Sequence, residues 1–157
     1  MYKRQTFVAQ NFGAGEQERI RRGTKTAFVM SGIFSLIISA AVFIFAAPLM
    51  RIFIDASETQ VIAAGVHYLR IEGAFYIGIG FLFLLYGYYR AIKRAGMSVV
   101  LTVISLGARV LLAYALSSIS SIGVTGIWAA IPIGWFLADV TGLIYMKFLS
   151  SNAGTGV

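Results

Sequence analysis

The stretch TKTAFVMSGIFSLIISAAVFIFAA, residues 24–47, decides the fold class, because it is a nearly unbroken apolar run that is long enough to cross a membrane. A bilayer core needs roughly 20 apolar residues in a helix. Three similar runs follow, at about 61–89, 97–118 and 124–148, and none alternates as a transmembrane strand does. Only helices and closed barrels satisfy every backbone group in lipid. We therefore predict an all-α integral membrane protein with four transmembrane helices.

The composition of the chain agrees with this prediction and excludes several functions. Of its 157 residues, 59% are hydrophobic and 12% are charged, whereas soluble domains carry about 25% charged residues. The absence of cysteine excludes thiolate metal sites, and one histidine without a carboxylate cluster argues against any protein metal site. No nucleophile–base pattern is present, so we predict neither enzyme activity nor a cofactor. Nucleic acid is not an expected partner of this +7 chain, because its basic residues lie at helix ends.

Basic residues predict the orientation, since loops rich in Lys and Arg stay in the cytoplasm. They precede the first run, separate the second from the third, and end the fourth: Arg19, Arg21, Arg22, Lys25, Arg90, Lys93, Arg94 and Lys147. The other two connections hold Arg51 with Asp55 and Glu58, and the uncharged stretch 118–123. We expect a multi-pass protein of the cell inner (plasma) membrane with both ends in the cytoplasm, surrounded by membrane lipid.

The two ends of the chain are predicted to lie outside the membrane-spanning unit. Residues 1–5 do not form a signal peptide, and we expect them to be a scar from construction or assembly. Residues 149–157 are rich in Gly, Ser and Asn, which predicts a flexible cytoplasmic tail. The membrane unit then covers residues 6–148.

The fourth run carries a packing signal, a small residue at every fourth position. The stripe comprises Gly126, Ala130, Gly134, Ala138 and Gly142. Small residues at this spacing let a neighbouring helix approach closely. Pro132 lies in the same run, and it predicts either a kink that lines a cavity or a tolerated bend.

Ionisable residues inside three of the runs are the candidates for function, because charges in hydrocarbon are costly and mark pathways or buried pairs. Glu72 lies roughly 16 Å from the outer end of the second run, and Arg109 roughly 18 Å from the inner end of the third. A Glu72–Arg109 pair is therefore possible, either as a structural ion pair or as a carboxylate that binds a proton, sodium or a cationic substrate. Asp139 and Tyr76 complete the candidates for substrate or ion binding.

Four motifs give the chain a resemblance to a known family. They are the segment Phe7–Glu16 with Arg19, the segment Tyr68–Ile71, Gly87–Arg90 followed by Ala95-Gly96, and Gly123–Trp128. This set resembles the multidrug and toxic compound extrusion (MATE) transporters over about residues 6–148. The resemblance implies that Gln10, Asn11, Gly13, Gly15 and Arg19 form a cytoplasmic turn between two helices.

The resemblance also implies a fold and an activity. The family has twelve helices in two lobes of six, so the chain would be the end of the eighth helix plus helices nine to twelve, a C-terminal lobe fragment. Its expected partner is the missing N-terminal lobe. Family members exchange drugs for sodium ions or protons. Where members place an acidic residue further down helix ten this chain has Ile79, and Glu72, two turns earlier, is a candidate substitute.

We therefore predict a secondary antiporter that exports cationic or amphipathic organic compounds in exchange for sodium ions or protons. One alternative is a lipid-linked sugar flippase of a related two-lobe family, which would need a basic cavity for its anionic cargo; Arg109 is the residue that favours it. The other alternative is a membrane structural subunit that transports nothing and whose charges only fix helix pairing.

Overall fold

A computed structural model describes residues 2–153 of the chain, with side chains described for residues 5–151. Throughout this range the regular structure is helical. The helices are α1 (Tyr2–Gly13), α2 (Gln17–Phe53), α3 (Thr59–Ala74), α4 (Tyr76–Ala91), α5 (Ala95–Ser117) and α6 (Val124–Ala153). The predicted all-α class is confirmed.

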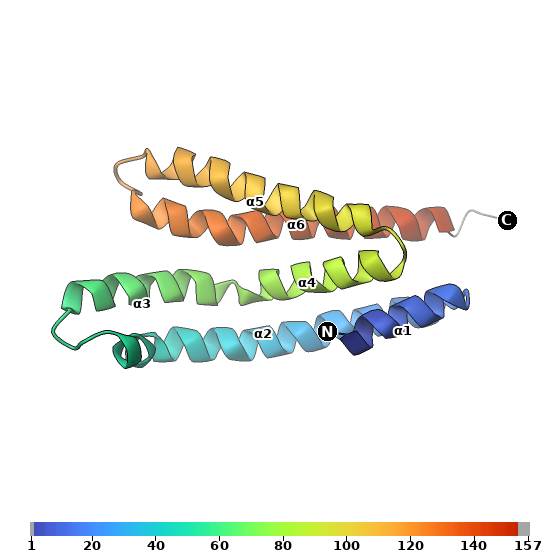
Figure 1. Ribbon diagram of the computed structural model, residues 1–157, viewed down its shortest axis with the longest axis horizontal. Coiled ribbons are helices and arrows are strands. Elements are labelled where there is room, and N and C mark those ends of the chain that lie inside the picture. Colours follow the sequence, from blue (N-terminus) through green and yellow to red (C-terminus); the bar gives the residue numbers. More distant parts are fainter. Residues whose placement is uncertain (1, 154–157) are drawn as a thin grey trace.

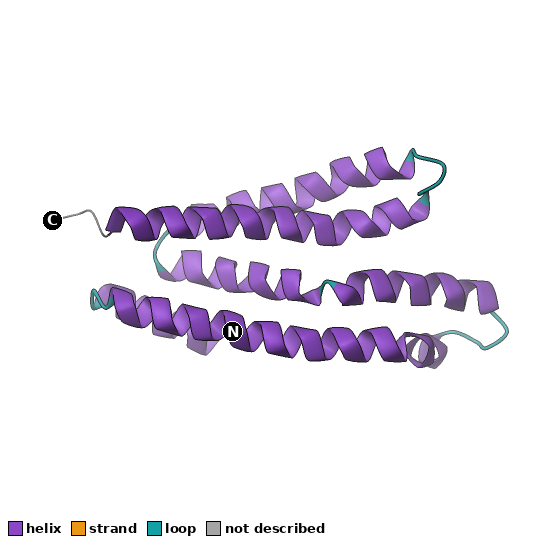
Figure 2. Ribbon diagram, turned by 180° about the vertical axis from the view of Figure 1, so that it is seen from behind, coloured by secondary structure: helices purple, strands orange, loops and turns teal. Residues whose placement is uncertain are grey.

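The helices lie side by side in an antiparallel bundle, with α3 and α4 in the centre between α2 and the α5–α6 pair (Figure 1). Helix α1 folds back along the first part of α2 and also contacts α4. Figure 2 shows the same order from behind. The α1–α2 turn, the α4–α5 connection and the C-terminal end of α6 lie at one end of the bundle, so the connections that carry most of the basic residues share that end.

The helices are long and apolar enough to cross a membrane, as predicted. Helices α2, α5 and α6 each suffice alone, and α3 with α4 passes the same test as a bent pair, which gives three to four candidate spans. This pair corrects the sequence prediction, because we expected one helix over 61–89 and the structure breaks it at Phe75 with a bend of 49°. Gly73 permits a close approach to Val42 of α2 beside the break, where a Cβ would lie 2.7 Å from the Val42 side chain. The break therefore coincides with tight packing that a larger residue would prevent.

The small-residue stripe of α6 packs as predicted. Ala130 and Ala138 are fully buried, and a Cβ added at Gly134 would lie 2.6 Å from the Ser105 carbonyl oxygen of α5. Gly142 faces α4 and α5 in the same way, and its carbonyl accepts a hydrogen bond from the buried Tyr89 hydroxyl. Helix α6 continues through Pro132, so this proline is a tolerated position rather than a break.

Both ends of the described range are helical. Residues 2–5, which we expected to be a scar, belong to α1. Helix α6 reaches Ala153, whereas we expected a flexible tail from 149; Leu149 packs against the core and prolongs the helix. Residues 1 and 154–157 of these two predicted segments lie outside the described residues.

Candidate functional site

The break between α3 and α4 positions Glu72. Its side chain lies in the last turn of α3 and is 5% exposed, although the residue is a carboxylate in an apolar bundle. Its carbonyl oxygen accepts a hydrogen bond from the Phe75 N–H, at 3.2 Å, where the helix ends. The carboxylate Oε1 is buried and has no hydrogen-bond partner among the described residues. A buried oxygen without a partner is costly, so it is suited to take a proton or a cation.

Arg109 reaches the same region from α5. Its charge acts on both Glu72 and Tyr68, and its Nε is buried without a hydrogen-bond partner in the described part of the chain. The two side chains nevertheless form no ion pair; the ion pairs of residues 5–151 join Glu18 to Arg21 and Arg22 at the surface. The Glu72–Arg109 ion pair that the sequence allowed is therefore absent, and Arg109 acts on the Glu72 carboxylate through its charge alone.

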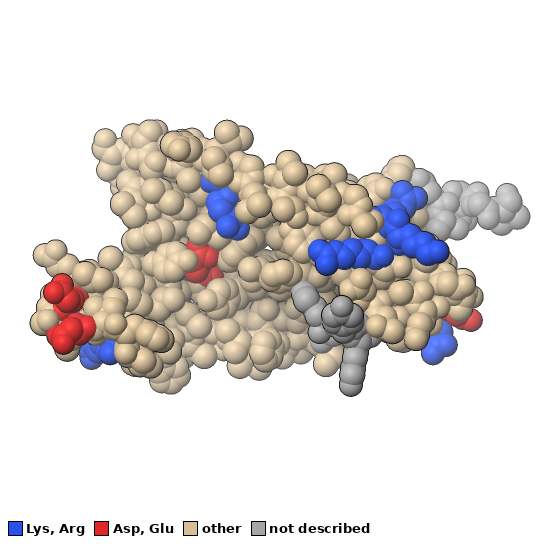
Figure 3. Space-filling model, viewed as in Figure 1, with Lys and Arg blue, Asp and Glu red and all other residues tan. Residues whose placement is uncertain are grey.

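Asp139 of α6 faces α4 beyond the break. It is 6% exposed, and its Oδ1 is buried without a hydrogen-bond partner among the described residues. Gly78 makes room for it, because a Cβ at that position would lie 3.7 Å from Asp139 Oδ2 and 3.4 Å from Trp135 Cβ. The bundle thus buries the carboxylates of Glu72 and Asp139. Glu72 lies on α3, which is followed directly by α4, and Asp139 lies on α6, which packs against α4. Figure 3 shows basic and acidic atoms midway along the molecule, apart from the charged side chains at its two ends.

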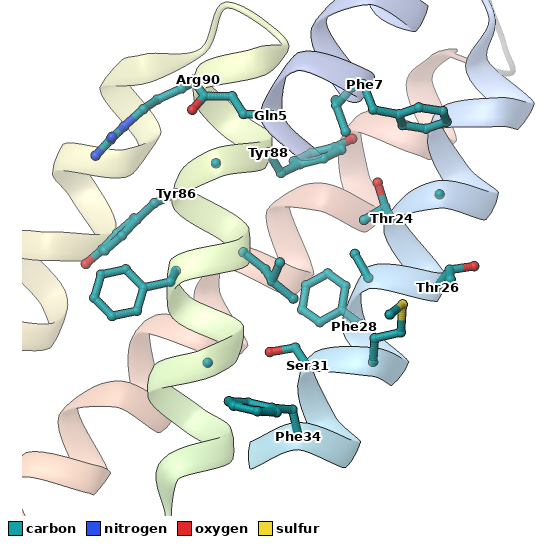
Figure 4. Close-up of a pocket in the computed structure, with 18 of the residues that line it drawn as sticks. Gln5, Phe7, Thr24, Thr26, Phe28, Ser31, Phe34, Tyr86, Tyr88 and Arg90 are labelled. Carbon is teal, nitrogen blue, oxygen red and sulfur yellow. The ribbon is translucent and has the colours of Figure 1, made fainter. Parts of the chain in front are cut away.

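Tyr76, the first residue of α4, belongs to a different feature. It lines a groove of about 1790 Å³ between α1, α2 and α4, and Glu72, Arg109 and Asp139 do not line this groove. Aromatic and hydroxyl side chains of α2 and α4, including Phe28, Phe34 and Thr24, project into it (Figure 4). The structure therefore does not gather all four candidates at one place.

The motif at the start of the chain forms the α1–α2 turn. Asn11 is buried, and its side-chain N–H donates a hydrogen bond to the Phe7 backbone carbonyl at 2.8 Å. The backbone carbonyl of Asn11 accepts a hydrogen bond from the Glu16 N–H at 2.9 Å. Gly15 has a φ of +75°, which glycine adopts without strain. The backbone carbonyl of Gln10 accepts a hydrogen bond from the Ala14 N–H at 3.0 Å. Gly13 ends α1, and Arg19 is exposed in the first turns of α2.

Sequence reasoning missed two features of the structure. One is the groove, for which Gly87 on α4 was the available signal, since it lines the groove and has nothing within 4 Å of an added Cβ. The other is a cluster that joins α3 to α6, in which the Trp128 ring lies 5.5 Å from His67 and 5.8 Å from Tyr68. Only the tertiary structure brings these rings together, because His67 and Trp128 lie far apart in the sequence.

The chain was compared with protein families, curated proteins and solved structures. The MatE family model matches residues 4–115, starting inside the segment that we expected to be a scar. The comparison with curated proteins gave no match. Among solved structures, the chain is similar to one described as "Inward-facing conformation of a multidrug resistance MATE family transporter of the MOP superfamily". The TM-score is 0.88 at 21% identity, over 98% of this chain and 36% of that chain. At this identity the similarity establishes the fold.

Proposed function

The chain belongs to the MatE family, and from this premise we propose that it forms part of a secondary antiporter that exports cationic or amphipathic organic compounds in exchange for sodium ions or protons. The family consists of transporters, in agreement with the prediction that the chain is not an enzyme. The chain itself is a multi-pass membrane protein.

The observation that carries the proposal is the buried Glu72 at a helix break. Broken helices form substrate and ion sites in many transporters, because irregular backbone is tolerated where it lines a cavity. A carboxylate at low dielectric favours a proton or a nearby cation over the bare charge. The unpartnered Oε1 of Glu72 offers such a position. A coupling ion and a cationic substrate that compete for this carboxylate would give exchange.

Arg109 is consistent with the same proposal, because it forms no ion pair with Glu72. Because its charge acts on the carboxylate without an ion pair, Glu72 stays available to an ion. A locked buried pair would have favoured the structural role that we kept as an alternative. Asp139 is the second carboxylate that we propose for ion or substrate binding, and its Gly78 contact places it beside α4.

The partners of this chain are part of the proposal. The chain spans 36% of the length of the solved transporter that it matches, and transporter cavities of this type form between two halves. We propose that a further lobe completes the cavity, that small organic cations are its cargo, and that the basic end of the bundle faces the cytoplasm of the cell.

The test is efflux per protein molecule in cells whose transporter contains this chain, with Glu72→Gln as the variant. Glu72→Gln keeps the size and removes the charge, so we expect normal abundance in the membrane and a loss of ion-dependent efflux. The matched control is Glu58→Gln, an exposed carboxylate that begins the same helix, and it should transport normally.

Two results would contradict the coupling role of Glu72. Unchanged efflux in Glu72→Gln would remove it directly. Reduced abundance that Arg109→Leu fully restores, together with activity, would assign both residues to packing, since the single variant strands a buried arginine. If the transporter instead moved anionic lipid-linked cargo and Arg109→Leu abolished that movement, the flippase alternative would hold.

A further inference from the structure

The buried oxygen of Glu72 limits which ion can bind there. Its Oε1 atom is enclosed by the atoms of these helices, and it has no hydrogen-bond partner among the described residues. When further parts of a transporter pack against the helices, that enclosure can only increase. An ion at Oε1 must therefore be liganded by this chain or need no ligands at all. A proton meets the second condition, because it forms an O–H bond on the carboxylate and requires no shell of oxygen atoms.

The backbone at the helix break is less suited to a sodium ion. Transporters that hold sodium at a broken helix do so with unwound backbone carbonyls. Here the carbonyls of Glu72 and Phe75 already accept hydrogen bonds, from the Phe75 N–H at 3.2 Å and from the Gly78 N–H at 2.9 Å. Over the described residues, no group of three or more His, Cys, Asp or Glu side chains is placed to hold a metal ion. The surroundings of Glu72 thus favour a proton.

Arg109 is the charged group of the described residues that acts on Glu72. It belongs to the contact between α5 and α6, where its Cβ lies 3.6 Å from the position that a Cβ added at Gly134 would take. The guanidinium forms no ion pair with Glu72. While Glu72 is ionised, the two charges offset each other. Once Glu72 carries a proton, the positive charge of Arg109 is left uncompensated, because a guanidinium keeps its charge in proteins.

The other ionisable groups of the packed helices do not replace Arg109 in this role. Helix α2 has none over residues 26–50. On α3, the guanidinium of Arg70 lies over the Phe43 ring of α2 at 5.2 Å, and the ring of His67 contacts the Thr125 hydroxyl of α6 at 3.4 Å. The remaining groups toward the middle and the outer end of the bundle are Tyr68 on α3, Tyr76 on α4, the exposed Tyr114 on α5 and Asp139 on α6.

A change of charge at Glu72 is felt by a cargo that does not touch the carboxylate. In an apolar bundle the effective dielectric is low, and a charge acts well beyond the distance of a direct contact. A cationic compound near Glu72 and Arg109 meets offsetting charges when Glu72 is ionised. After protonation it meets a fixed positive charge, which repels it. Protonation of one buried carboxylate is therefore sufficient to switch the site from holding a cation to releasing it.

We propose that Arg109 is a fixed cation that expels cationic cargo when Glu72 takes up a proton, so that the coupling ion is a proton and not sodium. This inference rests on the antiporter function proposed above. On the outer side, a proton from water forms an O–H bond on the Glu72 carboxylate and the cargo leaves. On the cytoplasmic side, that bond breaks, the proton passes to water, and the next cargo molecule binds. Arg109 keeps its charge through both steps.

The test is equilibrium binding of ethidium, a fluorescent organic cation, to the purified transporter that contains this chain, in nanodiscs of zwitterionic lipid. Acidification that protonates Glu72 should weaken ethidium binding roughly 5–150-fold, the usual range of coupling between two sites. Replacing sodium chloride by choline chloride at constant pH should leave the affinity unchanged. Because linkage is reciprocal, ethidium should also release protons into a weakly buffered solution as it binds.

Four variants separate the charge of Arg109 from its packing. Glu72→Gln resembles the protonated carboxyl group and should bind ethidium weakly at every pH. Adding Arg109→Gln removes the repelling charge, so the double variant should regain most of the lost affinity without regaining exchange. The matched control adds Arg70→Gln to Glu72→Gln instead and should regain nothing, since Arg70 lies against Phe43. Arg109→Lys alone keeps a positive charge and should keep the effect of acid.

The possible failures are distinguishable. Ethidium binding that sodium weakens at constant pH, or a double variant as weak as Glu72→Gln, would overturn this inference, and ion-driven efflux would still uphold the antiporter. A double variant that regains exchange as well as binding would assign both residues to packing. If neither a proton gradient nor a sodium gradient drove ethidium efflux, the proposed function itself would fail. The double variant leaves no buried charge unpaired, so we expect it to reach the membrane.

Discussion

Replacing Gly134 by alanine tests whether the close α5–α6 contact holds the bundle together. The new Cβ would lie 2.6 Å from the Ser105 carbonyl oxygen, a backbone atom that cannot rotate away. Overpacking of this kind costs typically 1–3 kcal/mol. In water a Gly-to-Ala change inside a helix also gains about 1 kcal/mol of helix propensity. In lipid both helices stay helical even when they separate, because their backbone groups are satisfied within each segment, so that gain contributes little here.

Gly107→Ala on α5 provides the matched control for this packing term. Nothing lies within 4 Å of a Cβ at Gly107, so the chemical change is identical and the steric cost is absent. We expect Gly134→Ala to be less stable than Gly107→Ala by ~1–3 kcal/mol, measured by reversible SDS-induced unfolding in bicelles. Equal stability of the two variants would refute the reasoning, since it would mean that α5 and α6 do not approach closely at Gly134.

Three further predictions concern hydrogen bonds and topology. Tyr89→Phe removes the buried hydrogen bond to the Gly142 carbonyl and should cost ~1 kcal/mol in the same unfolding assay; an unchanged midpoint would contradict it. The Ser57 N–H and hydroxyl lower the pKa of the exposed Asp55 below its ordinary value of 3.8. The hydrogen bonds to ionised Asp55 therefore stabilise this loop fully above pH 3.8, and this stabilisation is lost as the pH falls through the lowered pKa. Hydrogen exchange at the Ser57 N–H, corrected for intrinsic rates, should lose protection only in strong acid. Ser57→Cys should react with an impermeant thiol reagent from outside and Lys93→Cys from inside, and the reverse pattern would show an inverted topology.

The transmembrane spans and the packing stripe were predictable because both depend on local composition. Any 24-residue apolar run, such as 24–47, must be a buried or lipid-facing helix wherever it lies. Each small residue from Gly126 to Gly142 lies about one turn from the next by helical spacing alone, so together they form a continuous ridge along α6. The break at Phe75 was not predictable in the same way, because the glycines around it are tolerated in many unbroken helices.

The candidate site was predicted in part. Charged residues in a membrane run are conspicuous in any sequence, so Glu72, Arg109 and Asp139 stood out. Their partners did not, since depth along a helix fixes one coordinate and leaves the rotation of each helix open. Depth alone suggested an ion pair between Glu72 and Arg109, and the rotations of α3 and α5 leave these side chains close but unpaired.

The sequence by itself determined the class of the protein, its apolar spans and the face by which α6 packs, because lipid imposes one backbone solution on every apolar segment. The tertiary structure alone decided where the bundle breaks its central pair of helices, that Asp139 lies beside Gly78, and that α1, α2 and α4 line one groove. These outcomes depend on the relative rotation and shift of whole helices. Such rotations follow from many contacts acting together, and no single stretch of sequence contains them.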